Sequence, residues 1–400
     1  MTGSNALNKP KSIILDPNSP INFLVHGQGV FIFSCEQNET YFFISNADQS
    51  DGLIVTFTSH RIYVKQKSTG KYYIDYNNNS GIINKKGAYY WFSLDSQNTR
   101  FYAGIGEARK ENLTYQANYD SRTFLESLVT IVPEKNILPL RLLRDPITEN
   151  IALFVADTKK LTMDDVAAAK FMPTANMSPV CQQLYDCISG RRFVLDTPDF
   201  PDFTRAIQHS IDTKGLWCYE TLQRKSTEFN PNQPNILETY LRITLGQNNG
   251  ESPGIPYVME IWPSGHYSPI HNHSGANAII RVLHGSINVA LFPFLCPDGI
   301  EPFSVADFNK NDVTWISANL NQIHQLKNLE TNKDACITIQ CYMYDKYDSI
   351  HYDFFDYVDD NGTIQHYNPD SDMEFLAFKE QMRMEWDEYC RRKYKKQRKN

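Results

Sequence analysis

Short runs of aromatic and β-branched residues, separated by turn-forming residues, recur along this chain and constrain its fold more than any other feature. Between about 20 and 120 these runs are GVFIFSC, TYFFISN, LIVTFTS, RIYVKQK, KYYIDY, AYYWFSL and RFYAGIG. Segments such as NADQSDG, KSTGK and NNNSG separate them. Runs of this composition favour strands, and turns at this spacing are typical of an all-β sandwich, which we expect over residues 13–120.

Similar runs return between about 236 and 345, among them TYLRITLG, PYVMEIWP, ANAIIRVLHG, SINVALFPF and ACITIQCYMYD. The stretch before them contains segments with helical spacing, such as TMDDVAAAKF, where Thr162 and Asp165 stand at the positions of a capping box. The last stretch predicts an amphipathic helix, because Phe375, Phe378, Met382 and Trp386 recur with a helical period.

These patterns predict a mainly β chain with five parts. They are a disordered N-terminus at 1–12, the sandwich at 13–120, a mixed connector at 121–177, a second β domain at 178–365, and a C-terminal helix with a basic tail at 366–400.

Charge and cysteine usage exclude several classes of protein. The net charge is −7, and the tail RRKYKKQRKN alone holds seven cations, so the remainder is more acidic still and is not a general nucleic-acid binder. The tail is interpreted as a solvated helix end, with nuclear targeting or a phosphate-rich partner as the alternatives. The eight cysteines lack the short paired spacing of a zinc ribbon. Because the chain also lacks an apolar signal core and a run of eighteen apolar residues, we expect a soluble cytoplasmic protein with reduced thiols.

The segment GHYSPIHNHSGANAIIRVLHGSINV, from Gly265 to Val289, contains the most informative polar residues. On a strand, residues two apart point to the same face, so His271 and His273 are expected to converge on one side of a sheet. His324 follows in NLNQIHQLKN. Three neutral imidazoles facing one point form a site for a divalent transition metal. His266 is interpreted as a turn residue.

The order of these residues resembles the two motifs of the cupin family. Gly265, His271, His273 and Gly285 match the first motif, with Ala278 at its acidic position, and His324 with Asn328 matches the second. The loss of the acidic ligand resembles the cysteine dioxygenase family of thiol dioxygenases, over about residues 178 to 360. The resemblance implies a cupin β-barrel, a double-stranded β-helix, that holds Fe(II) on the three histidines.

The same resemblance implies roles for six further residues. Arg242, in YLRITL, corresponds to the arginine that binds the substrate carboxylate, and Tyr240 and Trp262 belong to the substrate-binding wall. Tyr342 is the catalytic tyrosine, which donates a hydrogen bond toward the iron site. Thr338 and Gln340 stand at the serine and histidine positions behind that tyrosine. Ala278 replaces the cysteine that animal members crosslink to the tyrosine, so no Cys–Tyr crosslink is expected.

The function implied is the conversion of cysteine or a related small thiol, with O2, to a sulfinic acid. The alternative is a catalytically weak or inactive cupin with a structural or interaction role, because Gln340 cannot titrate as a histidine does. The sequence leaves open which thiol is bound and the oligomeric state.

The first β domain carries a second resemblance. The segment GAYYWFSLDSQNTRFYAGIGE resembles the farnesoic acid O-methyltransferase-like β-sandwich domain, through Trp91, Gly104 and Gly106. The two glycines do not open a helix, so they do not form a dinucleotide-binding fingerprint. A binding or structural module is expected over 15–120.

Overall fold

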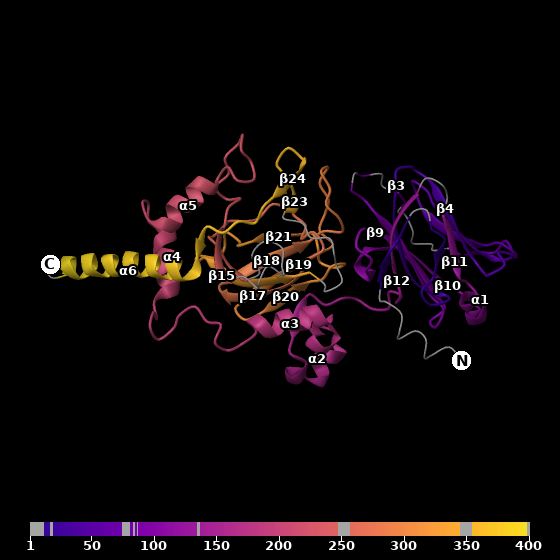
Figure 1. Ribbon diagram of the computed structural model, residues 1–400, viewed down its shortest axis with the longest axis horizontal. Helices are drawn as coiled ribbons and strands as arrows, with labels where there is room; N and C mark the ends of the chain where they lie inside the picture. The colour runs from indigo at the N-terminus through magenta and orange to yellow at the C-terminus, as the bar shows by residue number, and fades with distance from the viewer. Residues whose placement is uncertain are drawn as a thin grey trace. The chain divides into compact units, whose positions relative to one another are not determined.

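The computed structural model describes residues 12–16, 19–73, 81, 82, 85, 87–133, 137–246, 257–344 and 354–397 (Figure 1). It divides into two compact units, Met1–Ile151 and Ala152–Asn400. The predicted disordered N-terminus lies outside the described residues except for Ser12, where the first strand begins. The end of the basic tail, at 398–400, also lies outside them.

The first unit contains two six-stranded sheets. One sheet has the strand order β1 (Ser12–Ile14), β12 (Ile137–Leu143), β3 (Gln28–Cys35), β8 (Tyr90–Asp95), β9 (Arg100–Ile105) and β10 (Leu113–Asn118). The other has the order β2 (Ile21–Asn22), β11 (Thr130–Pro133), β4 (Thr40–Ser45), β5 (Gly52–Phe57), β6 (Ile62–Gln66) and β7 (Tyr72–Tyr73). Short helices η1 (Lys110–Asn112) and α1 (Arg122–Glu126) lie between the strands.

Strands β11 and β12 lie in the stretch that the sequence assigns to a connector. β11 pairs with β4, and β12 pairs with β3, each in antiparallel register. Each therefore adds a strand to one sheet of the sandwich, and the first unit extends past residue 120.

Phenylalanine side chains fill the interior of this unit. Phe42 packs edge-on against Phe33, with ring centroids 4.5 Å apart, and contacts Phe31, Phe57 and Phe92 in the same cluster. All five rings are fully buried. Because edge-to-face aromatic pairs add to the gain from area burial, this cluster is a main source of stability for the unit.

The second unit contains a six-stranded and a three-stranded sheet. The larger has the order β20 (Val313–Ile316), β17 (Asn277–His284), β22 (Cys336–Met343), β16 (Tyr257–Trp262), β15 (Leu241–Gly246) and β25 (Met373–Glu374). The smaller has the order β19 (Ser304–Asn309), β18 (Ser286–Leu291) and β21 (His324–Lys327). Two further pairs are β13 (Phe154–Ala156) with β14 (Phe171–Pro173), and β23 (Phe355–Val358) with β24 (Ile364–Tyr367).

The prediction of a mainly β chain is confirmed. The predicted closed barrel is not observed within the described residues. β17 and β22 belong to the six-stranded sheet, whereas β18 and β21 belong to the three-stranded sheet, and the two sheets are separate. Gly285, with a φ of 70°, forms the tight connection between β17 and β18. A Cβ there would lie 3.1 Å from the carbonyl oxygen of Ala335, so a larger residue would strain the turn.

Helices cover parts of the second unit. They are η2 (Thr158–Lys160), α2 (Met163–Ala167), η3 (Thr174–Asn176), α3 (Pro179–Ile188), α4 (Phe203–Asp212), α5 (Trp217–Lys225) and α6 (Phe375–Gln397). The predicted capping box at Thr162 and Asp165 is formed. α3 packs on β17 and β22, and α6 packs on α4. Phe378 and Met382 of α6 are fully buried.

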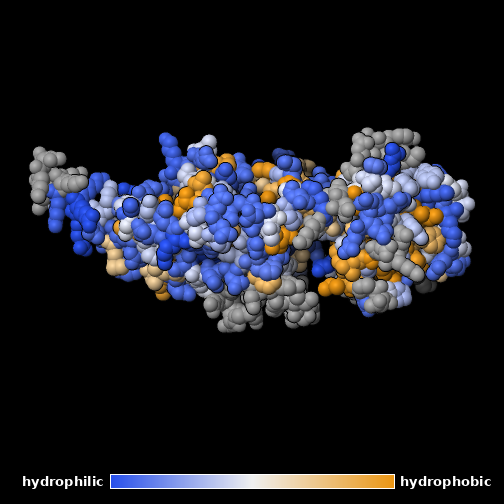
Figure 2. All heavy atoms as spheres, turned by 90° about the horizontal axis from the view of Figure 1, so that it is seen from above, coloured by the Kyte–Doolittle hydropathy of each residue, from blue (hydrophilic) through white to orange (hydrophobic). Residues whose placement is uncertain are grey.

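The C-terminal helix begins at Phe375, later than the boundary expected at 366, because residues before it form the end of β24 and β25. Its surface in Figure 2, at the left, is mostly hydrophilic. Among the described residues, no helix combines the length and the apolar character needed to cross a membrane.

Candidate metal centre

The three predicted ligands come from two places that the backbone ties together. His324 is the first residue of β21, whereas His271 and His273 lie in the segment between β16 and β17. The amide of His271 donates to the carbonyl of His324 at 3.1 Å, and the amide of His324 donates back at 3.0 Å. His271 also forms a bridge to Tyr357 in β23.

The expected continuous strand at His271 and His273 is therefore not observed. β17 begins only at Asn277, and His271 pairs as a single residue. The turn at Gly265, with a φ of 79°, and the proline at 269 interrupt regular pairing in this segment. Both imidazoles nevertheless reach the same cavity.

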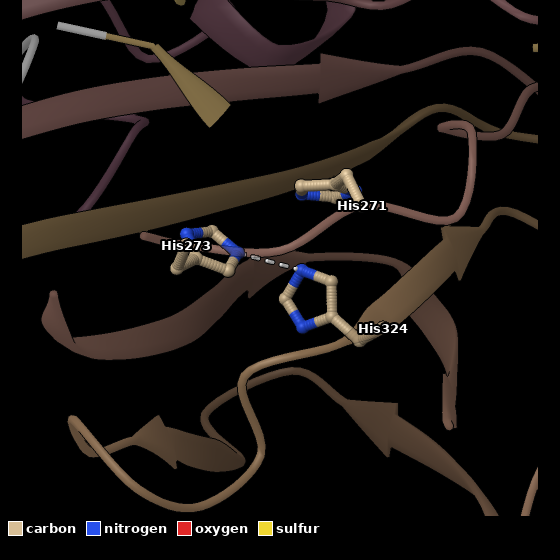
Figure 3. Close-up of side chains that lie close together, drawn as sticks. All are labelled: His271, His273 and His324. Carbon is tan, nitrogen blue, oxygen red and sulfur yellow. Dashed lines mark hydrogen bonds between the residues drawn. The ribbon is translucent and has the colours of Figure 1, made fainter. Parts of the chain in front are cut away.

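The imidazoles point toward one another (Figure 3). One ring nitrogen from each lies within 4.8 Å of the other two, and the three residues are buried. The Nε2 atoms of His273 and His324 are 3.0 Å apart. Two ligand nitrogens about 2.1 Å from one shared metal ion would have about this separation, so the pair fits a bound transition metal.

The protonation of the histidines also fits metal binding. The Nδ1 of His271 lies 3.0 Å from the carbonyl oxygen of Pro269 and donates to it, so the lone pair of Nε2 is left for a ligand role. Burial lowers the pKa of His271 to about 4. Burial, reinforced by neighbouring histidines, lowers the pKa of His273 and His324 well below the usual value. All three rings are therefore neutral near pH 7, as metal ligands must be.

The histidines line a small cavity. Its other lining residues are Tyr240, Arg242, Glu260, Trp262, Leu326, Gln340, Tyr342 and Phe355. The structure thus brings together every predicted site residue except Thr338, which lies directly behind this wall. Tyr240 and Trp262 stack on each other, with ring centroids 4.1 Å apart.

Arg242 has a partner that the sequence analysis did not identify. Its Nη1 lies 2.5 Å from Oε1 of Glu260, and both side chains are almost completely buried. The two residues face each other in the register of β15 and β16. The Nε of Arg242 is buried and has no hydrogen-bond partner among the described residues. The guanidinium therefore has one nitrogen paired with a carboxylate and, among the described residues, one buried donor without a partner.

A chain of hydrogen bonds continues from Glu260 to the predicted catalytic tyrosine. The amide nitrogen of Gln340 donates to Oε2 of Glu260, and the hydroxyl of Tyr342 donates to the amide oxygen of Gln340. The indole nitrogen of Trp262 donates to Oγ1 of Thr338 at 3.4 Å. Burial raises the pKa of Tyr342 well above its usual value, so its hydroxyl stays protonated.

Two predicted features of the wall have clear positions. Ala278 lies opposite Tyr342 in the register of β17 and β22, at the position where the family resemblance places a cysteine in animal members. The thiol of Cys341, the residue before Tyr342, donates to the carbonyl of Leu184 on α3. His266 lies outside the ligand group, and its Nδ1 lies 2.9 Å from the carbonyl oxygen of Thr239.

Asn328, the asparagine of the second motif, has a structural role. Its side-chain amide donates to the carbonyl oxygens of Trp262, at 2.9 Å, and Asp334, at 3.1 Å. It therefore fixes the chain after β21 and does not reach the ligand group.

Glu260, Leu326 and Phe355 are the cavity-lining residues that the sequence did not predict. Period-two alternation gives a signal for the first, because Glu260 stands two positions before Trp262 on one strand and shares its face. Phe355 stands two positions after a segment whose placement is not described, and no motif includes it.

No protein-family model matches the chain. Similar solved structures include the cupin domain of Cnp3 from Schizosaccharomyces pombe, at 14% identity and a TM-score of 0.21, with 26% of this chain and 65% of that one covered. A cupin superfamily protein of Desulfitobacterium hafniense has 15% identity and a TM-score of 0.20, covering 27% and 79%. The polyketide cyclase RemF of Streptomyces resistomycificus has 15% identity and a TM-score of 0.19, covering 26% and 63%. TM-scores this low indicate no function for this chain, and only its own residues do.

Proposed function

We propose that this protein is an iron-dependent thiol dioxygenase of the cupin type, which converts a small thiol and O2 to a sulfinic acid. One observation carries the proposal. Three neutral imidazoles, with no carboxylate in the ligand group among the described residues, share a buried cavity with an arginine that is only partly paired.

A bound Fe(II) would supply the redox chemistry, held by His271, His273 and His324. Three protein ligands leave coordination positions open for a thiol and for O2. Both atoms of O2 enter the sulfinic acid, and the thiol sulfur provides the four electrons that O2 accepts. The reaction therefore needs no further reductant.

The residues of the wall would bind and orient the substrate. Glu260 occupies Nη1 of Arg242, and the side of the guanidinium formed by Nε and Nη2 supports a bidentate contact to a carboxylate. Tyr240, Trp262 and Phe355 provide apolar surface beside it. Because the cavity is buried, it excludes most water and strengthens the charged contact.

Oxygen uptake tests the proposal. Full-length protein is loaded anaerobically with Fe(II), mixed with cysteine, and followed with an oxygen electrode. We expect uptake that requires both iron and thiol, together with a sulfinic acid that carries two ¹⁸O atoms when ¹⁸O2 is used. Cysteamine and 3-mercaptopropionate are run in parallel to define the thiol class.

Gln340 favours a second function, that of a cupin without catalytic activity. Its amide connects Glu260 to Tyr342 and cannot take up or release a proton near pH 7. Stoichiometric iron binding with no oxygen uptake on any of the three thiols would support this second function. Failure to bind iron at all would exclude the dioxygenase.

A further inference from the structure

We infer that Glu260 fixes the direction of the hydrogen bond at Tyr342, so that the Tyr342 hydroxyl accepts, rather than donates, a hydrogen bond in the cavity. Resting on the proposed function, this assigns the substrate class as a thiol that carries a hydrogen-bond donor, an amino group, as well as a carboxylate. It also departs from the expectation that Tyr342 donates toward the metal.

The direction is set at the ion pair. A guanidinium has only donors, so Arg242 must find an acceptor in Glu260, whose Oε1 lies 2.5 Å from Nη1. Both side chains are buried, and a buried cation without an anionic partner is costly. Glu260 is therefore ionised while Arg242 is charged, and an ionised carboxylate only accepts.

Gln340 transmits the direction. Because Glu260 only accepts, Gln340 must present its amide nitrogen to Oε2 of that carboxylate. Oγ1 of Thr338 lies 3.5 Å from the same nitrogen, which gives a second acceptor on that side. The amide oxygen of Gln340 then faces Tyr342.

Tyr342 has one hydroxyl hydrogen, and it is used in the bond to Gln340. Only the lone pairs of its oxygen remain for a molecule in the cavity, which Tyr342 lines. A ligand group that donates, such as an amine, is therefore favoured beside Tyr342. The Nε of Arg242, which has no partner among the described residues, favours a carboxylate on the same ligand.

The nearly isosteric substitution Glu260→Gln should reverse the whole chain. Arg242 still needs an acceptor, so the new amide presents its oxygen to Arg242 and its nitrogen to Gln340. Gln340 then turns its own oxygen toward residue 260 and its nitrogen toward Tyr342. The hydroxyl accepts from Gln340, and its hydrogen is released into the cavity.

The first measurement needs no metal. In ultraviolet resonance Raman spectra of the metal-free full-length protein, the intensity ratio of the tyrosine doublet distinguishes hydroxyls that donate from hydroxyls that accept. The difference between the parent and Tyr342→Phe isolates one of 23 tyrosines. We expect a donor-type doublet in the parent and an acceptor-type doublet in the Glu260→Gln background. An acceptor-type doublet in the parent overturns the inference, whether or not the Glu260→Gln variant folds.

The second measurement tests the substrate class on Co(II)-loaded protein, through the thiolate-to-cobalt absorption band. Cysteine and 3-mercaptopropionate both carry a carboxylate, so the ratio of their dissociation constants cancels the effect of the charge change on the carboxylate contact. The preference for cysteine should fall about three- to tenfold in Glu260→Gln, the range of one neutral hydrogen bond.

Tyr342→Phe should cause the same fall in the parent and no further fall in the Glu260→Gln background. If thiols bind but the ratio of the two dissociation constants does not change, the proposed substrate class is wrong, while the proposed function is unaffected. If no thiol binds, the proposed function and the substrate class fail together, while the Raman result still decides the direction of the hydrogen bond.

Discussion

Each unit of this protein contains a buried arginine, and the two are paired differently. In the sandwich, Arg109 donates through Nε to Glu111 at 2.9 Å and through Nη2 to the carbonyl of Ile151 at 3.2 Å, and its Nη1 lies 3.5 Å from Glu107. In the second unit Arg242 has Glu260 on Nη1, and its Nε is buried without a partner among the residues that the structure describes.

The comparison separates two uses of a buried cation. Arg109 has a partner at all three nitrogens, so folding alone satisfies it. Arg242 keeps an unpaired donor out of water, at a cost in stability that only a bound ligand recovers. We therefore expect the sandwich interior to provide stability and the second interior to bind a metal and a ligand.

The largest effect should follow removal of a ligand histidine. His271→Ala, His273→Ala or His324→Ala should each abolish stoichiometric iron binding, measured by metal analysis after anaerobic loading. His284→Ala, which changes a half-buried histidine outside the ligand group, is the matched control and should bind iron as the parent does. Full iron occupancy in any of the three variants would contradict the assignment of that residue.

Arg109→Ala tests the sandwich side of the comparison. Removing one partner of a buried pair leaves Glu107 uncompensated, so the free energy of unfolding should fall by about 3–5 kcal/mol, measured by urea denaturation. Iron binding at 4 °C should persist at about the parental stoichiometry. Arg122→Ala breaks an exposed pair with Glu126 and should cost less than about 1 kcal/mol. Equal losses in the two variants would remove the distinction.

Arg242→Lys tests the ligand side. Lysine lacks the two parallel donors of a guanidinium, so the KM for cysteine or a mercapto-acid should rise by about one to two orders of magnitude, as expected for about 1.5–3 kcal/mol. Cysteamine has no carboxylate and serves as the internal control, whose KM should barely change. If the KM rises equally for both substrates, Arg242 has a structural role, as Arg109 does.

The smallest effect is a pH dependence of the metal-free protein. The pKa of His271 is about 4 in the folded state, below its ordinary value of 6.5, so the unfolded chain binds the proton more readily between these values. The contribution of His271 to the free energy of unfolding is fully present above pH 6.5 and is lost as the pH falls toward 4.

Between pH 7.5 and 5.5 this histidine should contribute about 1.4 kcal/mol to that loss. In His271→Asn the loss over the same interval should be smaller by that amount, measured by denaturation in the presence of a chelator. His60→Asn, at an exposed position in the sandwich, should match the parent. An identical pH profile for all three proteins would show that His271 is not desolvated.

Local pattern predicted much of this molecule. Short runs of aromatic and β-branched residues between turn residues predicted the strands of the sandwich. The capping residues Thr162 and Asp165 predicted a helix start, because each of these signals acts within a few residues. β11 and β12 were missed because Pro133 and Pro139 made their runs resemble a connector. Only pairing with distant strands fixes them.

The same limit applies to the site. Motif spacing predicted that His271, His273 and His324 converge, but it did not predict the pairing of Arg242 with Glu260. That pair depends on the register of two strands joined by a segment that carries no register signal. The direction of the Gln340 amide follows in turn from that carboxylate, so it was not accessible from the sequence.

The reciprocal backbone bonds between His271 and His324 have a consequence for metal selection. These two ligands are held in place by the β framework itself, so loading the site requires little reordering of the chain. Ions can then leave and be replaced without unfolding. Because imidazole ligands bind Zn²⁺ and Cu²⁺ more tightly than Fe²⁺, the ion found in the isolated protein should reflect the supply of metals in the growth medium. The same polypeptide should accordingly be recoverable in several metal forms from one expression host.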